Sequence, residues 1–243
     1  MCIIATLSFA VGIAAFIFTI RVYRRVGKIE TARHNEIITL QNEIITLQRG
    51  LKESQDKTNA LLVEKYNDKS IQNLTPEEKA EVRSAVETIT DPETADDFFL
   101  KAYAAQIDGH HDTAIKHYKK VIELEPESPV AYYNMGNAYA NKQDYDKAIE
   151  CYEKAIELNP DLAEAYYNMG YIYDDKQDYD KAIECYEKAI ELKPCYADAY
   201  YNMGVAYLLK GDDETAIKCI KKAAELGDED ARKWLDDNDI NIN

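Results

Sequence analysis

The pentapeptide YYNMG occurs three times in this chain of 243 residues, at 132–136, 166–170 and 200–204. Successive copies begin 34 residues apart, and self-similarity at one fixed period is the signature of a repeat architecture. Laid out at this period, the chain gives four rows, 95–128, 129–162, 163–196 and 197–230. Each row holds two stretches with the apolar spacing of a helix around a polar turn. The period therefore predicts an all-α array of paired helices.

Eight positions of this period carry a resemblance to a known family. In the second row they are Tyr132, Met135, Gly136, Tyr139, Ala148, Tyr152, Ala155 and Pro160. The rows resemble the tetratricopeptide repeat, whose pattern has aromatic, small and alanine residues and a closing proline at these offsets. The resemblance implies a right-handed α-solenoid of four repeats over 95–230. The first row departs from the pattern at Lys101 and Val121, and the fourth at Ile220, as terminal repeats tend to do.

The residues that follow the fourth row predict one more helix. Gly227 suits the end of a helix and Asp228 suits the start of the next. A helix over 228–237 would place Ala231, Trp234 and Leu235 on one side. We expect this C-terminal capping helix to cover the open edge of the last repeat.

The two tyrosines of each YYNMG copy are expected to serve different faces. Tyr132 shares a helical face with Met135 and Tyr139 and should pack inward, whereas Tyr133 lies about 100° further around the helix. The resemblance implies that this second face lines a concave groove for partner peptides. Carried onto this sequence, the peptide-binding groove consists of Phe99, Tyr133, Asn134, Asn137, Tyr167, Asn168, Tyr171, Asp174, Asp175, Tyr201, Asn202 and Val205.

The chemistry of this groove suits an extended peptide, because aromatic rings supply apolar contact and asparagine side chains both donate to and accept from a backbone. The alternative is a general scaffold surface on which the asparagines only steady the packing between units. The family's carboxylate clamp needs lysine or arginine in the groove, but acidic residues such as Asp174 and Asp175 stand there. A partner with basic or apolar character is therefore favoured.

The overall charge excludes one class of partner. The chain has 45 Asp and Glu against 29 Lys and Arg, a formal net charge of −16. Such a surface repels a phosphate backbone, so we expect no nucleic acid partner. A protein or a peptide is the expected ligand.

Residues 2–20 contain no charged side chain and, as a helix, are long enough to cross a bilayer core. They predict a transmembrane anchor; a cleaved signal peptide is the alternative, although the basic residues follow the apolar stretch instead of preceding it. The positive-inside rule then places in the cytoplasm the basic residues Arg21, Arg24, Arg25 and Lys28. We expect a single-pass membrane protein with its N-terminus outside and its repeats cytoplasmic.

A shorter repetition lies within 31–66, where NEIITLQ occurs at 35–41 and again at 42–48. Its period of seven fills the a and d positions of a coiled coil with Ile37, Leu40, Ile44, Leu47 and Leu51. Ser54 and Thr58 end this pattern, and Gly50 weakens the helix. We expect a helical stalk that either forms a short coiled coil, and with it a homodimer, or lies as a single amphipathic helix along the membrane or against the body.

Between the stalk and the repeats, Thr75-Pro76-Glu77-Glu78 combines a capping threonine, a proline at the first helical position and a glutamate three residues after the cap. This motif predicts a linker helix over 76–90. Asp91-Pro92 should end that helix and restart the chain.

The sequence gives no sign of catalysis. Its five cysteines, Cys2, Cys151, Cys185, Cys195 and Cys219, lack metal-ligand spacing and are interpreted as small apolar side chains in a reducing compartment. No GxSxG, Walker A or HExxH motif is present, and His110 and His111 fall in a turn. We therefore predict no enzyme, no metal site and no cofactor.

Together these patterns predict a membrane-tethered adaptor or scaffold that binds a protein or peptide in its concave groove. The alternative is a structural, self-assembling membrane-associated protein, in which the stalks pair and the solenoids stack edge to edge.

Overall fold

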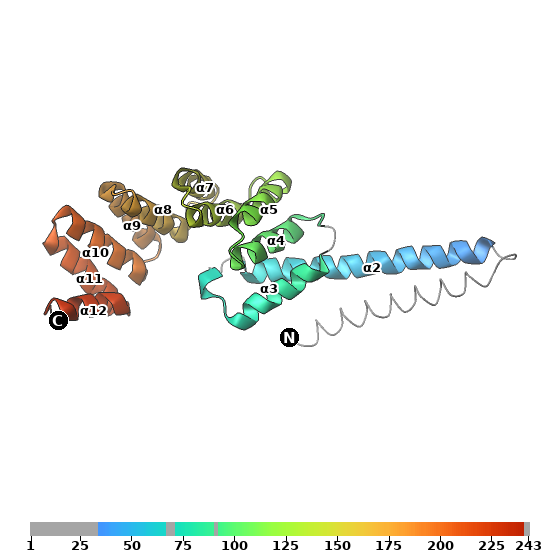
Figure 1. Ribbon diagram of the computed structural model, residues 1–243, viewed down its shortest axis with the longest axis horizontal. Coiled ribbons are helices and arrows are strands. Elements are labelled where there is room, and N and C mark those ends of the chain that lie inside the picture. The colour runs from blue at the N-terminus through green and yellow to red at the C-terminus, as the bar shows by residue number, and fades with distance from the viewer. Residues whose placement is uncertain (1–33, 67–70, 90–91, 241–243) are drawn as a thin grey trace.

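A computed structural model describes residues 34–66, 71–89 and 92–240. Within these ranges all regular structure is helical, which confirms the all-α prediction. Figure 1 shows the helices stacked one after another in chain order, from α2 to α12. This packing of consecutive helices is typical of a tetratricopeptide-type solenoid.

Four antiparallel helix pairs, here called units 1 to 4, form the body. Unit 1 is α4 (Ala95–Ile107) with α5 (His111–Leu124), and unit 2 is α6 (Pro129–Asn141) with α7 (Tyr145–Leu158). Unit 3 is α8 (Ala163–Asp175) with α9 (Tyr179–Leu192), and unit 4 is α10 (Ala197–Lys210) with α11 (Asp213–Glu225). Within each unit the first helix packs most extensively on the second.

Close approach of the two helices in a unit depends on a small residue in the first helix. A Cβ atom added at Gly136 would lie 2.6 Å from Cε1 of Tyr152, and one at Gly170 would lie 2.7 Å from Cε1 of Tyr186. Both rings are almost fully buried, so they cannot swing away. Glycine at this position therefore lets the tyrosine of the second helix enter the core.

The turn within each unit requires a left-handed backbone at one position. Gly109 and Gly211 have φ values of 75° and 83°, and Gln143 and Gln177, at the equivalent position of units 2 and 3, have φ values of 61° and 60°. Glycine adopts this conformation without steric cost, whereas glutamine is strained there. The middle units thus keep the same turn with a less suitable residue.

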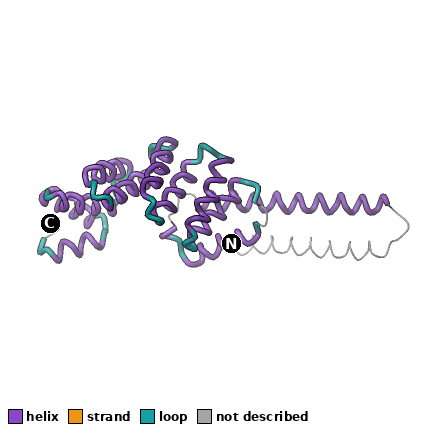
Figure 2. Tube along the Cα trace, turned by 45° about the horizontal axis from the view of Figure 1, so that its top comes forward, coloured by secondary structure: helices purple, strands orange, loops and turns teal. Residues whose placement is uncertain are grey.

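The N-terminal side of unit 1 is covered by α2 (His34–Tyr66), a short 3₁₀ turn η1 (Ile71–Asn73) and α3 (Pro76–Thr88). Tyr66 of α2 is fully buried, with its ring 6.1 Å from that of Tyr103, and Leu62 and Val82 are buried beside it. At the start of α3, Thr75 and Glu78 form a capping box. Figure 2 shows that the N-terminal part of α2 extends well beyond the body.

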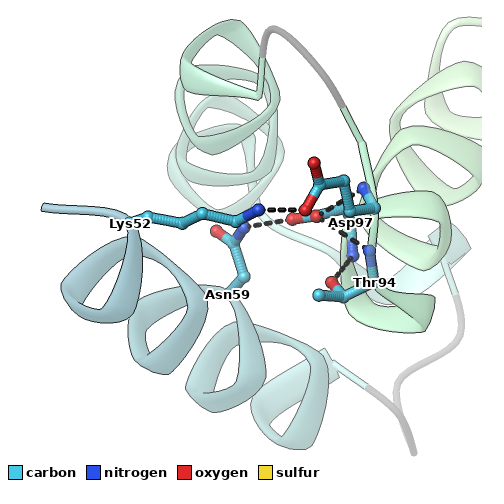
Figure 3. Close-up of polar contacts among 5 residues, drawn as sticks. Lys52, Asn59, Thr94 and Asp97 are labelled. Atoms are coloured by element: carbon cyan, nitrogen blue, oxygen red, sulfur yellow. Dashed lines mark hydrogen bonds and ion pairs between the residues drawn. The ribbon is translucent and has the colours of Figure 1, made fainter. Parts of the chain in front are cut away.

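A polar cluster joins α2 to the start of α4 (Figure 3). The Asn59 side chain, itself buried, donates to Oδ1 of Asp97 at 2.7 Å, and Oδ2 of Asp97 accepts from the backbone N–H groups of Glu93 and Thr94. Lys52 pairs with Glu93 at the edge of the cluster. A carboxylate that satisfies a helix start and a neighbouring amide at once fixes the position of α2 on unit 1.

The C-terminal edge of unit 4 is covered by α12 (Glu229–Asp237). Asp228 caps this helix by accepting from the N–H of Ala231 at 2.7 Å. Ala231 and Leu235 are fully buried against α11, and Trp234 is half-buried beside them.

The membrane topology predicted from the sequence requires a correction. Over 34–66, 71–89 and 92–240, no helix combines the length and the apolar character that a bilayer crossing needs. The expectation of a single-pass protein with cytoplasmic repeats is therefore wrong by this finding. The candidate anchor at 2–20 and the basic residues after it lie outside the described residues.

Candidate functional site

The inner face of the stack is formed by the first helices of the units. Helix α8 contacts both α6 and α10, and the first helices lie closer to one another than the second helices do. We call the surface on α6, α8 and α10 that carries Tyr133, Tyr167 and Tyr201 the inner face. Ten of the twelve predicted groove residues lie on the inner face, and each of these ten residues is at least partly exposed.

The paired tyrosines are less sharply divided than the sequence suggested. Tyr132 and Tyr133 are both half-buried, and both pack against the same core. The ring of Tyr133 lies 5.9 Å from that of Tyr152, and the ring of Tyr167 lies 5.8 Å from that of Tyr186. A rotation of 100° moves the second tyrosine only to the border of the core, so Tyr133 and Tyr167 present an edge to solvent and are not a free aromatic ladder.

The asparagines of the inner face connect neighbouring units. Asn168 donates to Oδ1 of Asn137 at 2.8 Å and to the hydroxyl of Tyr133 at 3.3 Å. In the next unit, Asn202 donates to the hydroxyl of Tyr167 at 3.0 Å. These amides are engaged inside the stack, as in the alternative interpretation, in which they steady the packing between units.

Two predicted groove residues are buried and are removed from the candidate site. Phe99 has 3% of its surface exposed, because its ring packs against Tyr103 and Tyr118 in the core of unit 1. Asn134 has 4% exposed. Unit 1 therefore offers little of an inner face, since α2 and α3 already cover it.

The residues that remain accessible cluster on α8. The ring of Tyr171 is 54% exposed, Asp175 is exposed, and Asp174 is half-buried beside them. Their spacing of three and four residues places them on one stripe of the helix. On α10, Tyr201, Asn202 and Val205 are half-buried. Leu209, at the position equivalent to Asp175, is 58% exposed one turn after Val205.

The acidic residues of α8 differ from those on the outer edge of the stack. Between units, lysines pair with aspartates in a regular ladder: Lys142 with Asp112, Lys176 with Asp146 and Lys210 with Asp180. Asp174 and Asp175 instead accept from tyrosine hydroxyls, Tyr186 at 2.8 Å and Tyr145 at 2.6 Å. Within the described residues neither carboxylate has an ion pair, so α8 keeps its negative charge.

Asp174 is held at some cost to the fold. Burial raises the pKa of its carboxyl above the ordinary value, the hydrogen bond from Tyr186 lowers it, and the charge of Asp175 raises it again. Its Oδ1 atom is buried and has no hydrogen-bond partner in the described part of the chain. The half-buried carboxylate thus keeps a hydrogen-bonding capacity that the described residues leave unused.

The pKa values of two neighbouring tyrosines are raised mainly by burial, and nearby carboxylates add to the shift. Burial, followed by the charge of Asp198, raises the pKa of Tyr167 to about 12. Burial, followed by the charges of Asp230 and Asp228, raises the pKa of Tyr201. Carboxylates of α10 and of the start of α12 thus lie near these two hydroxyls.

Three family models match the repeats. Two are described as "Tetratricopeptide repeat", one over residues 129–162 and 197–229 and the other over 151–184. The third is described as "TPR repeat" and matches 107–143 and 170–211. Together they extend from 107 to 229.

Solved structures with the same fold carry the name MamA. "Crystal structure of MamA" is 32% identical with a TM-score of 0.58, over 65% of this chain and 98% of that chain. "Crystal structure of MamA protein" is 31% identical with a TM-score of 0.57, over 73% of this chain and 96% of that chain. A third, "MamA AMB-1 P212121", is 23% identical with a TM-score of 0.55, over 66% and 96%, and shows likeness of fold alone. The comparison with curated proteins gave no match.

Proposed function

Because this chain belongs to the tetratricopeptide repeat family, we propose that it is a protein-interaction scaffold whose inner face binds an extended, basic segment of a partner protein. The binding surface is the stripe of α8 with Tyr171, Asp174 and Asp175, continued on α10 by Val205 and Leu209. Its role is to hold the partner and not to transform it.

The observation that carries this proposal is the unpaired acidic stripe beside an exposed ring. Between units, Asp112, Asp146 and Asp180 each pair with a lysine. Asp174 and Asp175 have only tyrosine hydroxyls as partners among the described residues. The exposed ring of Tyr171 offers apolar and cation–π contact to a lysine or arginine side chain. Charge complementarity then favours a basic segment over an acidic one.

The engaged asparagines limit how the partner is held. Since Asn168 and Asn202 already donate to tyrosine or asparagine oxygens, they are poorly placed to anchor a peptide backbone. The affinity must come from the aromatic ring and the carboxylates. We therefore expect recognition to depend on charge and salt more than on a backbone hydrogen-bond ladder.

A calorimetric titration tests this proposal with a ten-residue peptide of alternating lysine and serine, compared with one of glutamate and serine. The lysine peptide should bind and the glutamate peptide should not. Tyr171→Ala should weaken binding about tenfold, the usual effect of truncating an aromatic anchor. The helical unfolding transition should barely change, because the ring is largely exposed.

Leu124→Ala is the matched control, because Leu124 is 51% exposed but lies on α5, a second helix on the outside of the stack. This variant should bind the lysine peptide as the wild type does. Equal affinity for the lysine and glutamate peptides, or an equal loss of affinity in the Tyr171→Ala and Leu124→Ala variants, would show that the binding site does not lie on the inner face.

A further inference from the structure

Helix α2 has two halves with different surroundings. In its C-terminal half, Leu62 is 9% exposed and Tyr66 is fully buried, because both pack on unit 1. In its N-terminal half, Ile45 is 51% exposed and Leu47 is 49% exposed, while Ile44 and Leu51 are half-buried. Figure 1 shows this half projecting away from the repeats.

The heptad pattern ends where the helix reaches the body. Positions a and d hold Ile37, Leu40, Ile44, Leu47 and Leu51, and the next d position is Ser54. One residue later, Gln55 donates to the carbonyl oxygen of Thr88 at 2.9 Å and begins the contacts with α3. Asn59 adds a contact with α4 through its hydrogen bond to Asp97 (Figure 3). The break in the heptads thus marks a change of partner along one continuous helix.

We propose that the N-terminal half of α2, residues 37–51, pairs in parallel with the same segment of a second copy of this chain. Isoleucine at a with leucine at d is the combination that favours a parallel coiled coil of two helices. The flanking g and e positions pair Glu43 of one copy with Gln48 of the other, so no like charges meet. This inference is independent of the proposed peptide site.

Pairing would give the molecule two repeat bodies on one stalk. In each copy the C-terminal half of α2 still covers unit 1, because the residues that hold α2 on unit 1 lie after the heptads. A partner with two basic segments would then meet two inner faces, and linkage of this kind raises the apparent affinity without any new contact.

Sedimentation of the full chain at several concentrations tests the pairing. The wild type should form a dimer of twice the 27.8 kDa chain mass. Leu47→Glu should raise the dimer dissociation constant by about 100-fold, since each dimer loses two buried leucines. Ile45→Glu is the matched control: it introduces the same charge at a residue of equal exposure, but at a b position outside the seam. This variant should dimerise within about threefold of the wild type.

Two results would overturn the proposal. One is a wild-type monomer at every concentration, which would mean that the stripe is covered within a single chain. The other is equal behaviour of the Leu47→Glu and Ile45→Glu variants, which would place any association elsewhere. Circular dichroism of both variants confirms that the helices remain.

The orientation has its own test. Parallel pairing in register brings residue 47 of the two copies together, so Leu47→Cys should form a covalent dimer on mild oxidation. The wild type, which retains the exposed Cys195, serves as the control. If Leu47→Cys forms a dimer but crosslinks no more than the wild type does on oxidation, the arrangement is not parallel.

Discussion

Helices α7 and α9 have the same fourteen residues, YDKAIECYEKAIEL, yet their buried tyrosines donate to different partners. In α7 the hydroxyl of Tyr152 donates to Asn137 at 2.7 Å, whereas in α9 the hydroxyl of Tyr186 donates to Asp174 at 2.8 Å. The difference lies in the facing first helix, which has Ala140 in unit 2 at the position of Asp174 in unit 3.

The two end units extend this comparison. In unit 1 the tyrosine of the second helix, Tyr118, donates to Gln106 at 3.0 Å. In unit 4 that tyrosine is replaced by Ile220, and the facing position holds Leu208. In units 1 and 3 the facing residue accepts from the tyrosine, and in unit 4 an apolar residue faces Ile220, whereas in unit 2 the tyrosine finds its acceptor one turn earlier, at Asn137. The recurring residues therefore set the packing of the solenoid, while this one facing position sets the chemistry of the inner surface.

The largest effect is expected where α7 and α9 should behave alike, in the packing of their buried tyrosines against the first helix of the unit. Gly136→Val and Gly170→Val should each lower the free energy of unfolding by about 3 kcal/mol, because the added carbons meet a buried tyrosine ring. Ala102 at the same position of unit 1 shows that one methyl group is tolerated there, so valine is the sharper test. Denaturant unfolding measures both.

Gly50→Val is the control for this pair, since a side chain added at Gly50 meets nothing within 4 Å. Its effect should remain below about 1 kcal/mol, the scale of helix propensity alone. Clearly unequal losses for Gly136→Val and Gly170→Val would show that identical helices do not create identical cores.

A smaller effect is expected where α7 and α9 should differ, in the acceptor of the hydrogen bond from the buried tyrosine. Tyr186→Phe leaves the Asp174 carboxylate without its hydroxyl donor and should cost about 1–2 kcal/mol. Tyr152→Phe should cost about 0.5 kcal/mol, because Asn137 still accepts from Asn168. Thermal unfolding of the two variants side by side gives the comparison, and equal costs would refute the role assigned to the facing position.

The repeat period predicts the paired helices of the body because each unit follows from local spacing. Tyr132, Met135 and Gly136 lie three or four residues apart, and that spacing alone places them on one face. The same spacing could not decide how deep Tyr133 or Asn134 would sit, since their burial depends on the approach of the next unit. Phe99 was misplaced because the spacing could not show that its ring packs against Tyr103 and Tyr118 inside unit 1.

The contact of α2 with the body, which was one of the alternatives for the stalk, comes from residues that follow the stronger seven-residue pattern. Asn59, Leu62 and Tyr66 lie three and four residues apart, which is a readable signal, but it begins only after Ser54 ends the heptads. The recurrence of Tyr118, Tyr152 and Tyr186 at one position was also visible in the aligned rows. Neither signal identifies its partner without the packed structure.

The smallest effect on stability concerns Asp174 itself. Its folded pKa lies above the ordinary value of 3.8, so the native state binds the proton more tightly than the unfolded chain does. The stabilising effect of this site is therefore complete below the unfolded pKa and is lost as the pH rises through the folded pKa. As the pH rises from the unfolded to the folded pKa, the free energy of unfolding of Asp174→Asn should increase by a few tenths of a kcal/mol relative to the wild type, after allowance for partial solvent screening. Chemical denaturation at pH 4 and pH 7 measures the gain, and a loss at pH 7 would contradict the sign.

The central claim is that unit 3 keeps an acidic residue at a cost to its fold because this residue binds a basic partner. The most direct measurement is the affinity of Asp174→Asn for the lysine and serine peptide, taken at pH 7 beside the wild type. The claim predicts binding about fivefold weaker in a protein that unfolds no earlier than the wild type. Unchanged affinity in that variant would contradict it and would leave the carboxylate without a function.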